Sequence, residues 1–329
     1  MLSQPKAINL TSTEDGIHLG GSILWLDSNT TKDLSFLSAP HLEIRSLPTQ
    51  ILASEETLKI LNALNRKAKG LLCRFNQKFS IGRLHLELLP SGVGLEGSTL
   101  YIESDSQKIS YASEIQVDRM DVSRQLQVRK SDHLILGANA PYKAGLPVGQ
   151  RKKLVTSLKE KLESLSSEKL FDFCEVNPTA QEVIAILNQS GMVPKVDTTI
   201  KKISDIYGSY GIDVTSRKHP TQLNQGVSIL PLAKMKKFLG KNPSLESRVL
   251  AVASHPNDYN DLIHRWGDRL NIFYLPSHSY GIELKDYVQQ VAPNYLYLFG
   301  PYAKEYAEQF SSLAPYVEPI FPKHLRPLL

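Results

Sequence analysis

The sequence predicts an α/β protein, and three observations lead to that prediction. Residues 1–145 carry short apolar runs separated by polar turns, which is typical of a strand-rich section. From residue 149 onward, apolar runs alternate with amphipathic helical patterns, as in a doubly wound sheet. Strand and helix patterns of the same kind return after residue 275. The length of 329 residues suits one large α/β unit or a domain that carries an inserted second one.

The first section is predicted to contain short strands, one helix and a hairpin. In the helix, apolar residues recur at Leu58, Ile60, Leu61 and Leu64, which is helical spacing. The residues 104–107 form the expected turn of the hairpin. In chain order, we expect strands at 22–25 and 34–37, the helix at 55–67, a strand at 84–89, the hairpin strands at 100–103 and 108–112, and a strand at 134–136.

The later sections are predicted to alternate helices and strands. A charged amphipathic helix opens this part, and Gly191 and Gly211 follow the next two helices at the places where a helix commonly ends. The expected helices are 149–169, 179–188, 200–210, 281–291 and 301–313, and the expected strands are 170–175, 249–253, 271–275 and 295–299.

Charge and cysteine content narrow the classes of protein. The formal net charge of +5 permits a nucleic-acid partner without requiring one. The two cysteines, Cys73 and Cys174, are far apart and form no Cys-x-x-Cys pair, so a thiolate zinc site is not expected. The N-terminus shows no signal pattern, and no run reaches the ~20 apolar residues that span a bilayer. These features predict a soluble cytoplasmic protein without a membrane partner.

Three segments carry a resemblance to a known family. They read FLSAPHLEIRSLPTQI at 36–51, LLPSGVGLEGSTLYIES with KISYASEI within 88–115, and LPSHSYGIELKDYVQQVAPNYLYLFG at 275–300. Taken in order, they resemble the metallo-β-lactamase fold with a β-CASP insertion over nearly the whole chain. In length and layout the chain is similar to the ligase-associated DNA exonuclease and to RNA 3′-end processing nucleases. The resemblance implies an αββα four-layer sandwich of 1–145 with 275–329, interrupted by a β-CASP-like βα domain at 146–274.

The resemblance also identifies positions that bind metal in the family, and most have changed here. The His-x-His-x-Asp-His ligand places read Ala39, His41, Glu43 and Ile44, and Asp27 matches the acid that ends an early strand. The histidine place of the second segment is Val93, and the bridging aspartate place is Glu114.

The remaining motif places have largely lost their polar residues. His278 is retained, and in the family it positions or protonates rather than binds metal. Gly137 stands where an acid belongs, and Phe299 and Gly300 stand at the place of the last histidine. Because zinc needs three or four donors in fixed geometry, this set predicts the loss of the two-metal centre. We still expect the remnant candidates Asp27, His41, Glu43, Glu114 and His278 to converge.

The function predicted from these residues is non-catalytic. We expect a nuclease-like pseudoenzyme, without a cofactor, that binds a protein partner such as an active nuclease or a DNA or RNA processing complex, or binds nucleic acid. The alternative is a divergent metal-dependent hydrolase or exonuclease that uses zinc or manganese on Asp27, His41, Glu43 and Glu114. A purely structural protein is a third reading. The candidates for phosphate contacts lie in two basic clusters: Arg151, Lys152, Lys153, Lys236 and Lys237.

Overall fold

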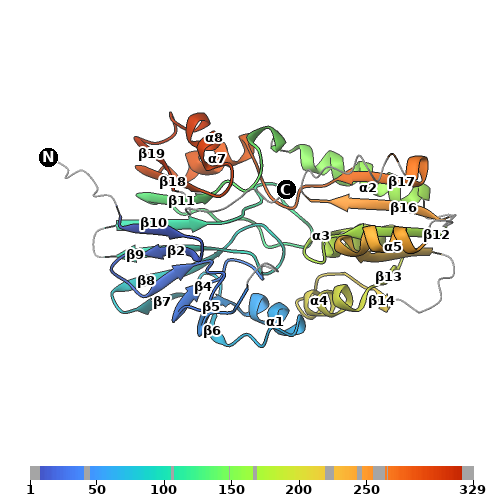
Figure 1. Ribbon diagram of the computed structural model, residues 1–329, viewed down its shortest axis with the longest axis horizontal. Coiled ribbons are helices and arrows are strands. Elements are labelled where there is room, and N and C mark those ends of the chain that lie inside the picture. The colour runs from blue at the N-terminus through green and yellow to red at the C-terminus, as the bar shows by residue number, and fades with distance from the viewer. Residues whose placement is uncertain are drawn as a thin grey trace. The chain divides into compact units, whose positions relative to one another are not determined.

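The computed structural model is a mixed α/β protein with three sheets of mixed and parallel strands (Figure 1). It divides into two compact units. Unit 1 comprises Met1–Arg119, Ser123–Val148 and His278–Leu329, and unit 2 comprises Met120–Val122 and Gly149–Ser277. The structure describes residues 8–40, 45–104, 107–147, 149–165, 169–218, 226–242, 247–254, 264 and 266–320.

Unit 1 contains two sheets. Sheet A has six described strands in sequential order, antiparallel from β1 to β3 and parallel from β3 to β6. Its strands are β1 Leu10–Thr13, β2 Gly16–Leu19, β3 Leu24–Leu26, β4 Leu34–Phe36, β5 Gln50–Ser54 and β6 Gly70–Cys73. Sheet B has seven described strands in the order β19-β18-β11-β10-β9-β8-β7. Its strands are β7 Lys78–Ile81, β8 Leu84–Pro90, β9 Ser98–Ser104, β10 Gln107–Ala112, β11 His133–Gly137, β18 Tyr295–Phe299 and β19 Tyr316–Pro319.

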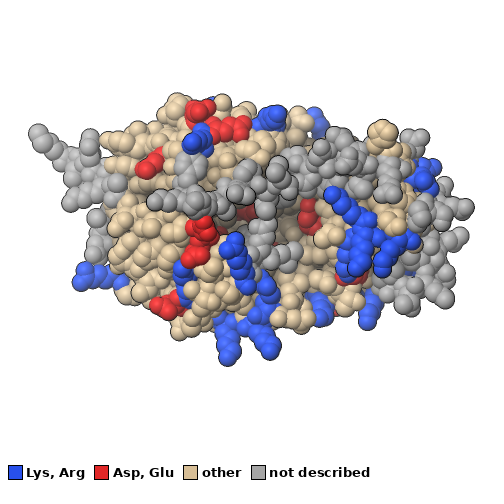
Figure 2. Space-filling model, in the orientation of Figure 1, with Lys and Arg blue, Asp and Glu red and all other residues tan. Residues whose placement is uncertain are grey.

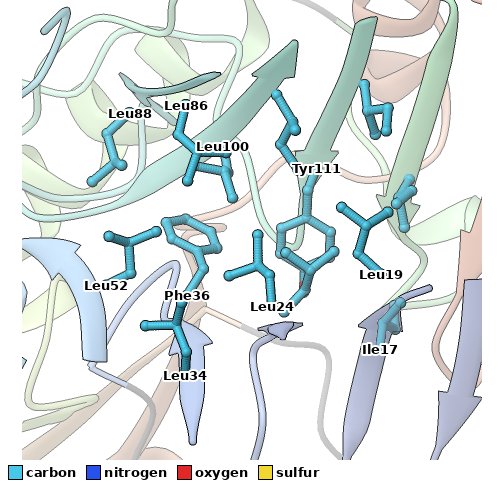
Figure 3. Packing of buried hydrophobic residues seen from close by; sticks show 14 of the residues in the cluster. Ile17, Leu19, Leu24, Leu34, Phe36, Leu52, Leu86, Leu88, Leu100 and Tyr111 are labelled. Carbon is cyan, nitrogen blue, oxygen red and sulfur yellow. The ribbon is translucent and has the colours of Figure 1, made fainter. Parts of the chain in front are cut away.

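The two sheets of unit 1 pack face to face around an apolar core. Phe36 and Leu52 from sheet A meet Leu88, Leu100 and Tyr111 from sheet B in this core (Figure 3). Successive side chains of a strand point to opposite faces, so alternate residues are available to a second layer on the outside. The outer face of each sheet is covered by helices.

Helix α1, Glu55–Ala63, covers the outer face of sheet A, where Leu58 and Leu61 pack with Ile51 and Ala53. Ser54 caps it by accepting a hydrogen bond from the Thr57 backbone. The outer face of sheet B is covered by α7, Ile282–Val291, and α8, Ala303–Gln309. Unit 1 is therefore layered as helix, sheet, sheet, helices.

Unit 2 is built on sheet C, a six-stranded sheet of parallel strands in the order β14-β13-β15-β12-β16-β17. Phe171, Phe173, Val249 and Ala251 pack on one face with Met235 and Leu239 from α5. The strands are β12 Lys169–Cys174, β13 Lys195–Val196, β14 Arg217–Lys218, β15 Gly226–Pro231, β16 Arg248–Ala253 and β17 Leu270–Tyr274. The helices are α2 Gln150–Leu165, α3 Thr179–Gln189, α4 Thr198–Ser209 and α5 Met235–Lys241.

Short 3₁₀ helices complete the described elements, at η1 Tyr142–Ala144, η2 Leu232–Lys234 and η3 Gly267–Arg269. Among the described helices, none combines the length and apolar character needed to cross a membrane.

Candidate functional site

Asp27 follows β3 directly and lies at the carboxyl end of that strand. Its backbone takes a positive φ of 47°, and its amide donates to the Phe36 carbonyl of β4 at 2.8 Å. Positive φ is uncommon for a residue other than glycine and is tolerated best by Asp and Asn. The side chain has its partners on Ser38, two residues after β4, and on Tyr111 of β10.

The Asp27 carboxylate accepts three short hydrogen bonds. The Ser38 amide donates to Oδ1 at 2.7 Å, and the Ser38 hydroxyl donates to Oδ2 at 2.6 Å. The Tyr111 hydroxyl, from β10, also donates to Oδ2 at 2.7 Å. Hydrogen bonds to an ionised acceptor are the stronger ones in proteins, so this carboxylate is fixed as a structural acceptor.

Tyr111 is fully buried and connects the core to the site. Its ring stacks on Phe299 at a centroid distance of 5.6 Å. It also makes an edge contact with Phe36 at a centroid distance of 6.0 Å (Figure 3). Burial raises the pKa of the Tyr111 phenol well above its usual range, and the Asp27 and Glu114 carboxylates add to the rise. The phenol therefore keeps its proton at neutral pH and donates a hydrogen bond to Asp27.

Glu114 and His278 form the second half of the site. Glu114 follows β10 by two residues, and its Oε2 lies 2.9 Å from the His278 Nε2. The other ring nitrogen of His278 lies 3.4 Å from the Tyr280 hydroxyl. His278 is buried and Glu114 is partly exposed.

The loop that carries His278 is tied to the segment after Glu114. The Ser279 amide donates to the Ile115 carbonyl at 2.7 Å. The Ser279 hydroxyl donates to Gln116 Oε1 at 2.9 Å and accepts from the Val117 amide at 2.9 Å. These contacts fix the histidine and the glutamate relative to each other.

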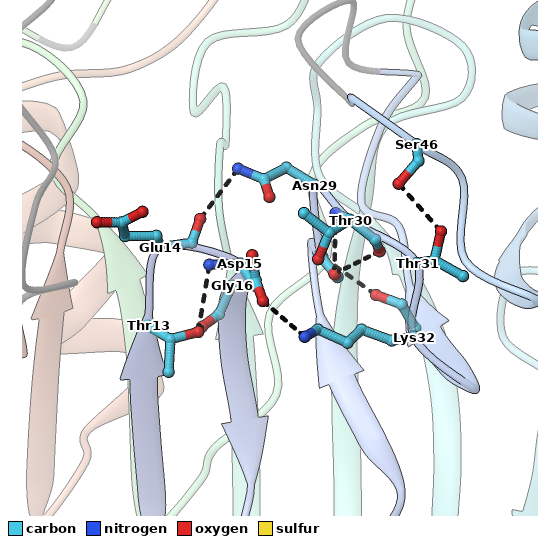
Figure 4. A network of polar contacts seen from close by, with 11 residues as sticks. Thr13, Glu14, Asp15, Gly16, Asn29, Thr30, Thr31, Lys32 and Ser46 are labelled. Atoms are coloured by element: carbon cyan, nitrogen blue, oxygen red, sulfur yellow. Dashed lines mark hydrogen bonds and ion pairs between the residues drawn. The ribbon is translucent and has the colours of Figure 1, made fainter.

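A polar network holds the loop that follows Asp27 (Figure 4). Lys32 Nζ lies 2.7 Å from Asp15 Oδ2, and its hydrogen bond holds the pKa of Asp15 below the usual value. The Asn29 side chain donates to the Glu14 carbonyl at 3.0 Å, and the Thr31 hydroxyl donates to that of Ser46 at 3.0 Å. The loop is anchored on both sides, which supports the fixed position of Asp27.

Of the five predicted remnant residues, Glu114 and His278 pair with each other, and Asp27 accepts a hydrogen bond from Tyr111, whose pKa the Glu114 carboxylate also raises. His41 and Glu43 lie outside the described residues. Sequence reasoning missed Ser38, Tyr111 and Tyr280 as members of the site. Tyr111 stands three residues before Glu114 in the motif KISYASEI, and that proximity was the available signal.

Other metal-ligand places of the resemblance hold residues that cannot bind a metal. Val93 is buried, and Phe299 stacks on Tyr111. At Gly137 a Cβ atom would lie 2.1 Å from the Ser113 carbonyl oxygen, so this place accepts no side chain without rearrangement. Over the ranges that the structure describes, no group of three or more His, Cys, Asp or Glu side chains is arranged to hold a metal ion.

The predicted phosphate-binding residues fall into two kinds. Four of the predicted residues are exposed: Lys152 and Lys153 on α2, and Lys236 and Lys237 on α5. Basic side chains gather over α5 in Figure 2.

Arg151 was predicted to contact phosphate, but its guanidinium is buried in the structure. It makes a two-pronged ion pair with Glu182, at 2.7 Å for Nη1 to Oε1 and 2.5 Å for Nη2 to Oε2. Its Nε also donates to the Pro276 carbonyl at 2.9 Å. These partners occupy the donors that a phosphate would need, so Arg151 is a structural residue of unit 2.

Comparison with known proteins gives the fold and no activity. No family model and no curated protein matches the sequence. Among solved structures, the chain is similar to the crystal structure of a protein of unknown function from Enterococcus faecalis V583. The TM-score is 0.61 at 14% sequence identity, and the match covers 88% of this chain and 79% of that chain. At this identity the likeness shows a shared fold alone.

Proposed function

We propose that the chain has the metallo-β-lactamase fold with a β-CASP-like insertion. The order of layers in unit 1 supports this proposal, because two facing sheets carry helices on both outer faces. The order along the chain supports it as well. Unit 2 is a parallel βα unit that interrupts unit 1 between β11 and β18, which are neighbouring parallel strands of sheet B.

We further propose that the protein is catalytically degenerate. The observation that carries this proposal is the state of the two carboxylates: Asp27 accepts three hydrogen bonds, and Glu114 pairs with His278. A two-metal centre needs those oxygens for its ions, together with imidazoles at places that here are Val93 and Phe299. The described residues therefore do not fit a binuclear zinc centre.

The role proposed for such a chain is that of an interaction subunit. Nuclease complexes of this superfamily can pair an active subunit with a degenerate one, which is an argument by analogy. The partner would be a protein of that kind, such as an active nuclease or another member of a DNA or RNA processing complex. Nucleic acid is the second partner proposed, and the exposed lysines of α2 and α5 support it.

Cleavage assays test the proposal against its alternative, a divergent metal-dependent hydrolase. Single- and double-stranded DNA and RNA are incubated with the protein in zinc, manganese or magnesium, beside a Glu114→Ala variant. We expect no turnover above a buffer control for either protein. Cleavage that requires a metal and disappears in Glu114→Ala would support the divergent hydrolase, whose proposed metal ligands are Asp27, His41, Glu43 and Glu114.

A further inference from the structure

Strand β6 is an open edge of sheet A. It comprises Gly70–Cys73 and pairs in parallel with β5, with Leu71 opposite Leu52 and Leu72 opposite Ala53. No described strand pairs with its outer side. An exposed edge offers backbone donors and acceptors to any added strand, and natural proteins usually protect such edges with charges, prolines or bulges. The four residues of β6 include neither a charge nor a proline.

Two neighbouring leucines are exposed on this edge. Leu71 is 50% exposed and Leu72 is 65% exposed. Consecutive side chains of a strand point to opposite faces, so both sides of β6 present apolar surface. The other large apolar side chains that are exposed among the described residues occur singly, as at Ile23, Val193 and Tyr316. An apolar strand edge without a charge or a proline is a template on which a further strand can pair.

The edge is surrounded by positive charge. Residues 57–86 contain no Asp or Glu but seven Lys and Arg residues: Lys59, Arg66, Lys67, Lys69, Arg74, Lys78 and Arg83. Two of them are paired with acids outside this range, Lys59 with Glu55 and Lys78 with Glu103. Lys69 precedes β6 and Arg74 follows it, and both are exposed. Figure 2 shows basic side chains around β6 and α1. A ligand of this edge therefore has to combine apolar and acidic groups.

We propose that the β6 edge binds an extended acidic and apolar segment of a partner protein, which adds to sheet A as a further strand. Apolar side chains of that segment would contact Leu71 and Leu72, and its flanking acids would lie beside Lys69 and Arg74. The inference deepens the proposed interaction role and rests on it. It replaces an unspecified partner with one class of binding segment.

Charge argues against the other occupants. If two copies paired through β6 in an antiparallel, two-fold manner, Leu71 of one copy would face Leu72 of the other. Lys69 would then face Arg74, and like charges directly opposite each other destabilise a sheet. A nucleic acid would use the positive charge, but its phosphates gain nothing from two exposed leucines. A strand with acidic ends satisfies the backbone, the leucines and the cations together.

A synthetic peptide tests this inference directly. The probe is a capped, fluorescein-labelled peptide of sequence EDVTVTVDE, titrated against the whole chain and followed by fluorescence anisotropy. We expect saturable binding, together with slower amide exchange in residues 70–73. A Leu71→Ser/Leu72→Ser variant should bind roughly tenfold or more weakly, because two apolar contacts are lost. A matched Ile23→Ser variant, which changes a leucine-sized side chain that is 60% exposed elsewhere, should bind like the wild type.

Two control peptides separate strand addition from charge attraction. EDVPVPVDE cannot donate the central backbone hydrogen bonds, and KKVTVTVKK reverses the flanking charge, so both should bind much more weakly. The inference is overturned if EDVTVTVDE fails to bind or binds the double-serine variant equally well. It is also overturned if that variant instead loses self-association or oligonucleotide binding. If the peptide does not bind and the protein cleaves no nucleic acid, the strand-addition proposal fails and the proposed loss of catalysis stands. If the protein cleaves nucleic acid in a metal-dependent way, the proposed loss of catalysis fails whether or not the peptide binds.

Discussion

The Asp27 carboxylate links the apolar core of unit 1, through Tyr111, to the polar residues that follow β3 and β4. Ser38 and Tyr111 donate to it from segments that are far apart in sequence, and Tyr111 is part of the core between the sheets. Asp27 was predicted from its place at the end of a strand. Ser38 and Tyr111 were not predicted, because the Ser38 contact depends on the pairing of β3 with β4 and the Tyr111 contact on the packing of sheet A against sheet B.

Tyr111→Phe tests the structural role of this contact. The change removes one donor to a charged acceptor and keeps the ring, so we expect unit 1 to lose about 1.5–3 kcal/mol of unfolding free energy. Trp25 and Trp266 are the two tryptophans and lie in different units, so a Trp266→Phe background lets urea titration report unit 1 alone. Tyr316→Phe, at an exposed ring stacked on Tyr295, is the control and should change little. Equal effects of the two substitutions would refute this role for Tyr111.

The buried Arg151–Glu182 ion pair gives a second prediction for the stability of the protein. Because both groups are buried, Glu182→Gln leaves a buried guanidinium without its counter-charge, and we expect a loss of about 3–5 kcal/mol in unit 2. Replacing both residues by Met should restore much of the stability. The exposed Lys59–Glu55 pair is the control, since Glu55→Gln should cost under about 1 kcal/mol. The measurement is urea unfolding followed by Trp266 in a Trp25→Phe background, and a small loss for Glu182→Gln would argue against a structural ion pair.

Among the elements, β12 carries an unusual residue at the centre of sheet C. Asp172 is fully buried, and neither carboxylate oxygen has a hydrogen-bond partner among the described groups. Burial raises the pKa of Asp172 to about 8, the Phe173 backbone amide, which lies outside normal hydrogen-bond geometry, opposes part of the rise, and the nearby Glu175 carboxylate adds to it. The folded protein therefore retains a proton on Asp172 at pH values where the unfolded chain has released it.

The sign of the resulting pH dependence follows from proton binding. Between about pH 5 and about 8 the native state binds the extra proton, so Asp172 makes unit 2 less stable as pH rises, by at most about 1.4 kcal/mol per pH unit. The Asp172→Asn substitution removes the titrating carboxyl group and with it this pH dependence of the stability of unit 2. We expect the stability difference, variant minus wild type, to grow with pH across that window when urea unfolding is followed by Trp266. Parallel pH profiles for the two proteins would contradict the raised pKa.

The elements themselves were predictable where their patterns were long. The expected helix 179–188 corresponds to α3, Thr179–Gln189, and the hairpin corresponds to β9 and β10. The helix expected at 55–67 ends earlier, at Ala63, because Asn65 and Lys67 take positive φ. Strands β1, β2, β5, β6 and β7 were missed. They have four or five residues each, too few for a clear alternation, and β6 is largely exposed.

The whole molecule is a mixed α/β protein of two compact units with three sheets. The α/β class followed from periodicity alone, because alternating strand and helix patterns restrict the architecture strongly. The sequence did not predict whether the polar residues of the site bind a metal or form hydrogen bonds with each other and their neighbours. The residue types at 27, 114 and 278 are compatible with metal ligands or with hydrogen-bond partners, and the contacts of Asp27 and Glu114 support the second interpretation.

Metal analysis of the purified 329-residue chain is the sharpest test of the proposed loss of the metal centre. The protein is incubated with zinc or manganese, exchanged into metal-free buffer and analysed by mass spectrometry, beside Glu114→Ala treated in the same way. Since the carboxylates of Asp27 and Glu114 already have protein partners, we predict far less than one ion per chain, with no difference between the two proteins. One or two tightly held ions per chain that are lost in Glu114→Ala would contradict the account and identify a working metal centre.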